Sequence, residues 1–158
     1  MPTHVLAELN IARLVAPMDD PQIADFRNGL ETINRLAESS PGFVWRLKDD
    51  SGNATNIHVY DDPLLIVNLT AWETVDDLFR YTYSSDHVDF FRRRAEWFSR
   101  LSTPSFVLWW QPIDQMPPSL DEAKARLDHL TAQGATPHAF TFKKRFTVEE
   151  AVQYTLAT

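Results

Sequence analysis

The polar residues best placed to carry out chemistry lie on two strand-like segments. Glu8 and Asn10 share one side of an alternating N-terminal segment, and Asn68 and Thr70 share one side of a later one. Polar groups within a mostly apolar, aromatic-lined space are typical of a small-molecule site. Burying such a group without a partner costs roughly 1–3 kcal/mol, so each is either kept for a ligand or paired internally. In the alternative interpretation, Glu8 simply pairs with Arg46 and the two asparagines bond neighbouring backbone.

Two further side chains are predicted to reach the same space. Arg46 comes from a strand expected at residues 43–48, and Trp72 ends the strand expected at residues 64–72. If the register of the earlier strand slips by one residue, Trp45 replaces Arg46, because successive side chains point to opposite faces. The residues predicted to bind substrate from these strands are Glu8, Arg46, Asn68, Thr70 and Trp72.

His87 is the most attractive single catalytic candidate, because it lies at or near an expected helix start. A helix N-terminus disfavours the charged imidazolium, and a neutral imidazole can accept a proton or bind a metal or haem iron. The alternative is that His87 only caps the helix or bonds the region of Ser84. The five histidines are scattered without a paired ligand motif, so no metal site is predicted.

Three consecutive arginines at residues 92–94 give the next helix a basic side. These arginines could hold an anionic substrate or the carboxylates of a partner, and Arg94, which is nearest to the apolar edge, is included among the predicted substrate-binding residues. The alternative is an ordinary solvated face, which is the usual meaning of a charged stripe on a helix.

Composition limits the partners and cofactors. The chain has 158 residues and a net charge of −7, with 44% hydrophobic and 12% aromatic residues. These values fit one soluble domain and do not favour nucleic acid or an anionic membrane, because phosphate contacts need clustered lysine and arginine. No cysteine, signal peptide or Gly-rich phosphate loop is visible. We therefore expect a cytoplasmic protein without a nucleotide cofactor.

Apolar spacing and capping residues, among them Asp20 before the first helix and Ser119 before the last, predict the order of the elements. The expected segments are a strand at 4–12, a helix at 21–38, strands at 43–48 and 64–72, helical residues at 74–98 with a break at 83–85, a strand at 106–110 and a helix at 119–134. This is the order of the split βαβ or ferredoxin-like fold, an α+β class with a four-stranded antiparallel sheet. A long polar turn is predicted at 49–62, a helix cap at Ser84 or Ser85 and an edge strand at 139–142. The C-terminal tail is expected to be loosely held, with a weak helix start from Thr147 to Glu150.

The strand at residues 64–72 determines what must cover the sheet. Its side that begins at Leu65 is wholly apolar and is expected to pack against helices, whereas the side containing Thr70 is expected to face an enclosed, partly polar space. That second side is still too apolar to be solvated, so we expect a second copy of the chain to cover it in a homodimer. In the alternative, residues 120–146 cover it within one chain.

Short segments at residues 40–43, 72–74 and 84–87 are similar to the turns of a known superfamily. They resemble the dimeric α/β-barrel superfamily, which includes antibiotic-biosynthesis and haem-degrading monooxygenases. The resemblance implies a barrel domain at 1–112 and a C-terminal extension at 113–158 packed on the same domain. A closer resemblance, to one uncharacterised bacterial and fungal domain family, spans nearly the whole chain and rests on residues 10–13, 41–47, 87, 92–98 and 123–127.

The superfamily resemblance implies a monooxygenase-like enzyme, acting on an apolar or aromatic, polyketide-like substrate without a tightly bound organic cofactor. Asn10 and His87 are then the predicted catalytic residues, as an enolate-stabilising group and a general base. Haem-degrading members use an asparagine, a tryptophan and a histidine. Asn10 matches the first, Tyr81 stands near the place of the second and is added to the substrate-binding set, and His87 precedes the expected histidine. The alternatives are a non-catalytic dimeric binder of hydrophobic ligands and a haem protein with His87 as ligand.

Overall fold

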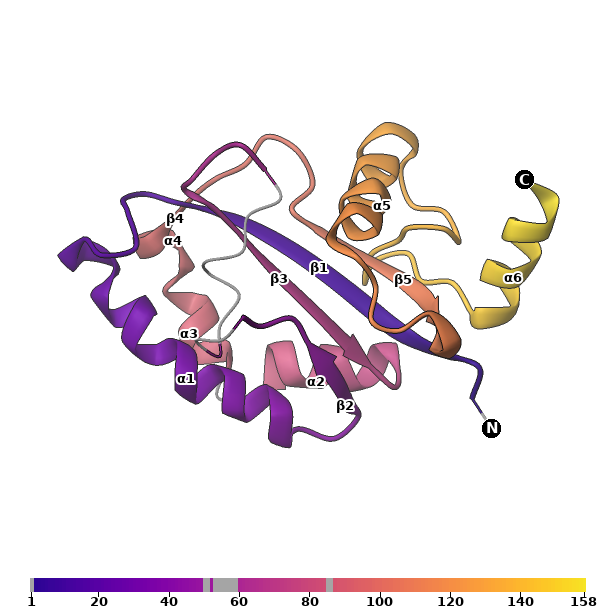
Figure 1. Cartoon of the computed structure of the whole chain (residues 1–158), viewed down its shortest axis with the longest axis horizontal. Coiled ribbons are helices and arrows are strands. Elements are labelled where there is room, and N and C mark those ends of the chain that lie inside the picture. The colour runs from indigo at the N-terminus through magenta and orange to yellow at the C-terminus, as the bar shows by residue number, and fades with distance from the viewer. Residues whose placement is uncertain (1, 50–51, 53–59, 85–86) are drawn as a thin grey trace.

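The computed structural model describes residues 2–49, 52, 60–84 and 87–158. Most of the long turn predicted at 49–62, and Ser85 as a predicted helix cap, lie outside the described residues. Within them, an antiparallel sheet lies between helices on both of its faces (Figure 1).

The sheet has the order β2-β3-β1, and β5 pairs with the other side of β1. Each of these pairings is antiparallel. This arrangement confirms the predicted α+β class and ferredoxin-like strand order. The strands are β1 (His4–Leu14), β2 (Phe43–Arg46), β3 (Leu65–Trp72), β4 (Phe98–Ser99) and β5 (Phe106–Pro112).

The helices begin where short polar side chains can satisfy free backbone N–H groups. As predicted, the side chain of Asp20 accepts a hydrogen bond from the backbone N–H of Gln22, and that of Ser119 accepts one from Glu122. The helices are η1 (Pro21–Ile23), α1 (Ala24–Ser39), α2 (Val75–Ser84), α3 (His87–Arg92), α4 (Arg94–Trp97), η2 (Ile113–Gln115), α5 (Leu120–Gln133) and α6 (Val148–Ala157).

The helical region before β4 ends one residue earlier than expected. The helix expected to reach Phe98 stops at Trp97, and Phe98 and Ser99 form β4 opposite the end of β1. Because β5 begins opposite Asn10, the last residues of β1 have free hydrogen-bonding groups that β4 satisfies.

The C-terminal extension also differs from the expectation. Of the edge strand expected at 139–142, Phe140 forms one bridge with Leu108 of β5, with both N–H···O distances at 2.8 Å. The tail contains α6, which begins at the helix start expected there, with a complete capping box between Thr147 and Glu150, so it is more regular than the loosely held tail that was expected.

The partly polar side of the sheet faces α1–α4, so the expectation that it would face away from these helices is wrong. Leu6 of β1 packs with Ala37 of α1 and Leu78 of α2, and Leu14 packs with Phe26 of α1. Glu8 and Asn10 lie on this same side of β1, so their side chains point towards α1–α4.

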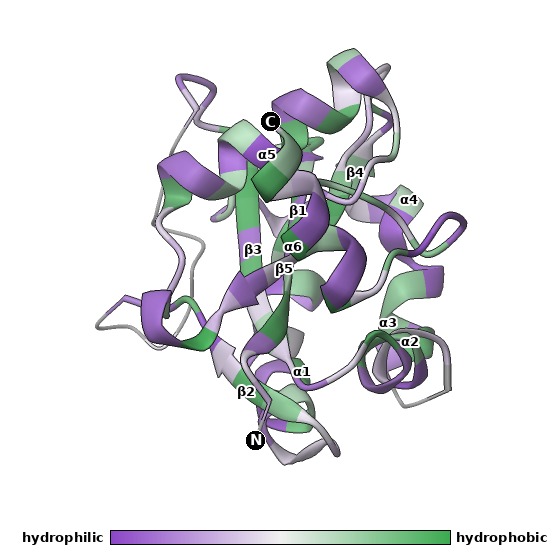
Figure 2. Cartoon of the chain, turned by 90° about the vertical axis from the view of Figure 1, so that its right-hand side faces the viewer, coloured by the Kyte–Doolittle hydropathy of each residue, from purple (hydrophilic) through white to green (hydrophobic). Residues whose placement is uncertain are grey.

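The opposite, wholly apolar side is covered by α5. Leu9 and Leu69 of the sheet pack with Ala123, Leu127 and Leu130 of that helix. Figure 2 shows α5 on one side of the strands and α1, α2 and α3 on the other. Both sides are thus covered within one chain, which removes the uncovered face from which a second copy was inferred. The homodimer itself stays a prediction.

Candidate functional site

Four polar side chains are brought together by the register of three strands. Glu8 of β1 is paired with Thr70 of β3, and Thr70 is paired on its other side with Arg46 of β2. Asn10 follows Glu8 on the same side of β1, because side chains two residues apart in a strand share a face. The sheet thus presents a row of one acid, one hydroxyl and one guanidinium towards α1 and α2.

Glu8 is the centre of a hydrogen-bond network. It is only 3% exposed. The side-chain nitrogen of Asn10 donates to Oε1 at 2.6 Å, and the hydroxyl of Thr70 donates to Oε2 at 2.7 Å. The indole nitrogen of Trp72 donates to the hydroxyl oxygen of Thr70 at 2.9 Å. Since an indole is only a donor, the hydroxyl proton of Thr70 is directed to the carboxylate.

Burial raises the pKa of Glu8 from its ordinary value of 4.5 to about 7, and the hydrogen bonds from Asn10 and Thr70 oppose that rise. Both carboxylate oxygens accept hydrogen bonds, so the network is arranged for the ionised form while the apolar surroundings favour the neutral one. A carboxylate balanced in this way can take up a proton close to neutral pH.

Arg46 lies on the same row without pairing with Glu8. Its side chain is 10% exposed, and its Nη2 is 3.6 Å from the carboxylate of Glu38, beyond hydrogen-bonding distance. Among the described residues, no group accepts a hydrogen bond from its Nε. The alternative that Glu8 and Arg46 simply neutralise each other is therefore wrong. Arg46 and not Trp45 faces the helices, because Trp45 packs on the α5 side.

An aromatic series runs from the sheet to α3. The ring of Tyr81 is 5.0 Å from Trp72 and 4.8 Å from His87, and His87 is followed by Phe91 at 6.1 Å. The pKa of Tyr81 is raised by burial and, to a lesser extent, by the charge of Glu8. The hydroxyl group of Tyr81 therefore stays protonated throughout the physiological range.

His87 is fixed by the backbone of α2. Its Nδ1 lies 3.1 Å from the carbonyl oxygen of Thr82. Only a protonated Nδ1 can donate to that carbonyl, so the neutral ring carries its lone pair on Nε2. Burial lowers the pKa of His87, and the bond to Thr82 opposes this shift. The neutral form expected from the sequence is therefore favoured, but chiefly by burial.

A cavity of about 790 Å³ connects these groups between the sheet and the helices. Eight of the nine side chains predicted for the site line it, which are Glu8, Asn10, Arg46, Asn68, Thr70, Tyr81, His87 and Arg94.

Three of the predicted residues, Trp72, Asn68 and Arg94, are placed differently from the other six. Trp72 is fully buried behind Thr70 and is not part of the lining, so it acts through the hydroxyl. Asn68 is exposed. Arg94 lies 4.2 Å above the ring of Phe91 and donates to the carbonyl oxygen of that residue.

Several lining residues lie outside the predicted set of nine. Arg92, Arg100 and Phe142 also line the cavity. Phe142 belongs to the C-terminal extension and packs 5.0 Å from Phe106 of β5. The sequence offered one signal for Phe142. Phe140 and Phe142 are two residues apart, which places both rings on the same side of a short extended segment.

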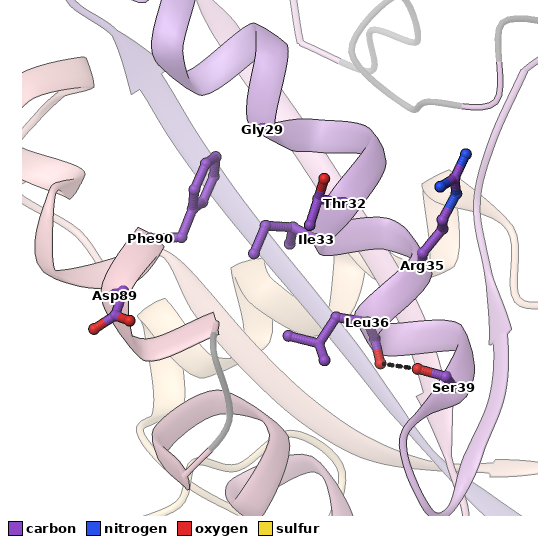
Figure 3. A pocket seen from close by; sticks show the side chains of 8 residues that line it. All are labelled: Gly29, Thr32, Ile33, Arg35, Leu36, Ser39, Asp89 and Phe90. Atoms are coloured by element: carbon purple, nitrogen blue, oxygen red, sulfur yellow. Dashed lines mark hydrogen bonds between the residues drawn. The ribbon is translucent and has the colours of Figure 1, made fainter.

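A second, shallower hollow lies between α1 and α3 (Figure 3). Phe90 packs so closely on α1 that a side-chain carbon at Gly29 would lie 2.3 Å from its ring. The polar groups around this hollow, including Thr32, Arg35 and Asp89, form no shared network in Figure 3.

Two other kinds of feature are absent from the described residues. These residues contain no group of three or more histidine, aspartate or glutamate side chains able to hold a metal ion. The helices formed by the described residues include none long and apolar enough to cross a membrane.

Two solved structures from Nitrosomonas europaea are similar to this chain. One, described as a "putative antibiotic biosynthesis monooxygenase", is 16% identical with a TM-score of 0.47, over 75% of this chain and 98% of that one. The other, a protein of unknown function, is 13% identical with a TM-score of 0.44, over 75% of this chain and 95% of that one. A comparison with curated proteins gave no match.

The strand order, the helices on one side of the sheet and the polar floor beneath them define a ferredoxin-like α+β protein with a cavity between sheet and helices. The chain belongs to the family described as a domain of unknown function, DUF3291, whose sequence model matches residues 5–156. This match confirms the resemblance to an uncharacterised domain family.

Proposed function

We propose that this protein is a small-molecule enzyme that removes a proton from an apolar or aromatic substrate in the cavity, as the first step of a monooxygenase-like oxidation. The observation that carries the proposal is the buried carboxylate of Glu8, whose pKa of about 7 suits a general base at neutral pH. Asn10 and Thr70 hold this carboxylate in place, and Trp72 is a positioning residue that acts through Thr70.

The proposed reaction begins at a C–H bond next to a carbonyl group. The proton passes to Glu8, and the electron pair stays on the substrate as an enolate. Molecular oxygen is the second substrate, and it accepts electrons from the enolate carbon. For a CH₂ group that becomes a ketone, one oxygen atom enters the new carbonyl and the other leaves as water with both hydrogens. The chain supplies the base, and Arg46 supplies a cation that can hold a substrate oxygen.

The test is hydrogen exchange of enolisable aromatic ketones in D₂O. With 2-tetralone and its tricyclic homologues, the wild type should accelerate loss of the α-proton NMR signal over buffer. Glu8→Gln should reduce that acceleration by roughly 100- to 10,000-fold. Glu31→Gln, a change at an exposed residue of α1, should leave it unchanged. Oxygen uptake by the wild type, measured with an oxygen electrode, tests the second step.

Ketone binding without any acceleration of exchange would overturn the enzyme proposal and favour a non-catalytic binder of hydrophobic ligands. We also propose that the chain forms a homodimer, which sedimentation at the same protein concentrations should show as a species of twice the mass of one chain.

Haem binding through His87 is the second candidate function. The observation that favours it is the hydrogen bond from Nδ1 to Thr82, which is the usual support for a histidine that binds iron through Nε2. Bound haem would supply redox chemistry at its iron. A Soret band that appears on haem titration of the wild type and shifts or is lost in His87→Ala would support this candidate. An unchanged free-haem spectrum would exclude it.

A further inference from the structure

We propose that the cavity is built for aromatic carboxylates, with the acidic group of the ligand held by Arg46. This inference rests on the proposed function and specifies its substrate class. Three features of the site support it, which are an incompletely satisfied buried guanidinium, the sign of the charges around the cavity and the aromatic character of its walls.

Arg46 is a charged group that the chain itself leaves incompletely satisfied. Its side chain is nine-tenths buried, and Nε has no acceptor among the described residues. The nearest carboxylate, that of Glu38, is 3.6 Å from Nη2 and itself partly exposed. An unsatisfied buried donor costs roughly 1–3 kcal/mol, and this cost is removed when a ligand brings an acceptor. A carboxylate matches the planar fork of a guanidinium with two parallel hydrogen bonds.

The charge around the cavity is opposite to that of the whole chain. The chain has a net charge of −7. Among the described residues that line the cavity, however, four are arginines and one is an acid. Arg46 lies on the floor, and the other lining arginines are Arg92, Arg94 and Arg100. The acid is Glu8, which burial makes partly neutral. A positive cavity in a negative protein selects anionic ligands and repels cationic ones.

The walls indicate that the rest of the ligand is aromatic. Tyr81, Phe91, Phe106 and Phe142 line the cavity. Flat aromatic rings favour stacked or edge-on contacts with a flat ligand. The Cα atoms of Arg46 and Glu8 lie two strand spacings apart, about 9–10 Å, because Thr70 lies between them. One ligand can therefore contact the guanidinium with its acidic group and the base with a different part of its ring system.

The test compares 2-naphthoate with its uncharged amide, 2-naphthamide, by calorimetric titration of the full chain at pH 6. At this pH naphthoate is ionised, while Glu8, with a pKa of about 7, is mostly neutral. We expect naphthoate to bind at least 10-fold more tightly than naphthamide. Arg46→Met should weaken naphthoate binding by roughly 10- to 100-fold and leave naphthamide within about threefold of the wild type.

Matched variants separate the role of Arg46 from a general charge effect. Arg80→Met removes the same charge from an exposed residue outside the cavity and should change naphthoate affinity by less than about twofold. Arg94→Met, at the cavity, should weaken it by about two- to fivefold. Arg46→Lys keeps the charge without the planar fork, so its loss should be intermediate. That variant provides the test if Arg46→Met does not fold.

The outcomes distinguish this inference from the proposed function. If naphthamide binds as well as naphthoate, or if Arg46→Met weakens both ligands equally, the inference is overturned. Tighter binding of 2-naphthyl phosphate than of naphthoate would also overturn it, in favour of a phosphate site. Exchange of neutral ketones that still depends on Glu8 would then leave the proposed function standing. Specific binding of naphthoate without any Glu8-dependent exchange would support the ligand class and contradict the enzyme.

Discussion

The two faces of the sheet are made by the same strands but differ in what they bury. On the α5 side, residues such as Leu9, Leu69 and Leu127 are no more than 3% exposed and form a continuous apolar core. On the α1–α4 side, Glu8 and Thr70 are buried among apolar residues beside a cavity. The first face is packed as a stabilising core. The α1–α4 face is less densely packed, and it holds polar groups in fixed positions.

The C-terminal extension, which contains α5, allows the opposite face of the sheet to be polar. Because α5 supplies a dense core on one face, the sheet can tolerate a partly filled cavity and a buried acid on the other. We therefore expect substitutions on the α5 side to affect mainly stability, and substitutions on the α1–α4 side to affect mainly the candidate site.

The largest expected effect is on the α5 side. Leu127→Ala removes a fully packed side chain, so it should lower the free energy of unfolding by about 2–5 kcal/mol in urea denaturation. The pKa of Glu8 and the affinity for naphthoate should not change in the folded variant. Leu30→Ala, at the wall of the cavity, should cost less than about 2 kcal/mol, because one side of Leu30 already faces empty space. Equal costs would contradict the difference in packing.

The next effect is a pH dependence of stability caused by Glu8. Its pKa is about 7 in the folded protein against an ordinary value of 4.5. Between these values the unfolded chain loses the proton and the folded chain keeps it, so stability falls as pH rises from 4.5 to 7 and levels off above. The shift corresponds to about 3 kcal/mol.

Glu8→Gln cannot ionise and should escape this loss. Its free energy of unfolding relative to wild type should increase by about 3 kcal/mol between pH 4 and pH 8, whatever the constant cost of the substitution. The same urea series on Glu31→Gln should show no such increase. A difference between Glu8→Gln and wild type that does not vary with pH would mean that Glu8 is ionised normally.

A smaller effect is expected at Thr70. Thr70→Val keeps the shape but removes both the donor to Glu8 and the acceptor for Trp72, so it should destabilise the protein by roughly 1–3 kcal/mol. Since the lost hydrogen bond lowers the pKa of Glu8, that pKa should rise and the pH profile of ketone exchange should move to higher pH. Thr70→Ser retains the hydroxyl and should keep the wild-type profile. If the pH profile of ketone exchange is the same in Thr70→Val as in the wild type, the proposed network is excluded.

The smallest expected effect is a difference between two paired asparagines, Asn10 of β1 and Asn68 of β3, in their influence on the pKa of Glu8. Asn68 is exposed, so Asn68→Ala should change stability by less than about 0.5 kcal/mol and leave the pKa of Glu8 unaltered. Asn10 donates to Glu8 at 2.6 Å, so Asn10→Ala should raise that pKa. Carboxyl titration of both variants would measure the difference. An equal rise of the Glu8 pKa in both variants would show that the polar floor extends as far as Asn68, and no rise in Asn10→Ala would contradict the hydrogen bond from Asn10.

Local signals in the sequence were sufficient for much of the fold. The alternation around Glu8 and Thr70 predicted strands, and Asp20 and Ser119 predicted helix starts, because both kinds of signal depend on neighbours within a few residues. Periodicity shows that a strand has two different sides, but it does not show which side the helices cover. The assignment of the polar side of β3 to a partner chain failed for that reason.

The candidate site was predictable in membership but not in roles. Shared alternation placed Glu8, Asn10 and Thr70 together, but their hydrogen bonds depend on the pairing register of β1 with β3. The same register inserts Thr70 between Glu8 and Arg46, which kept them from forming the ion pair considered from the sequence. Sequence favoured His87 as the base, whereas the burial of Glu8 became visible only with the helices in place.

The most direct test of the buried base is a ¹³C NMR titration of the glutamate side-chain carboxyls, with Glu8→Gln used to assign the signal. The structure predicts one carboxyl that titrates with a midpoint of about 7 and is missing from the variant. A Glu8 signal that titrates near 4.5 would contradict the account, because the carboxyl would then be an ordinary solvated acid.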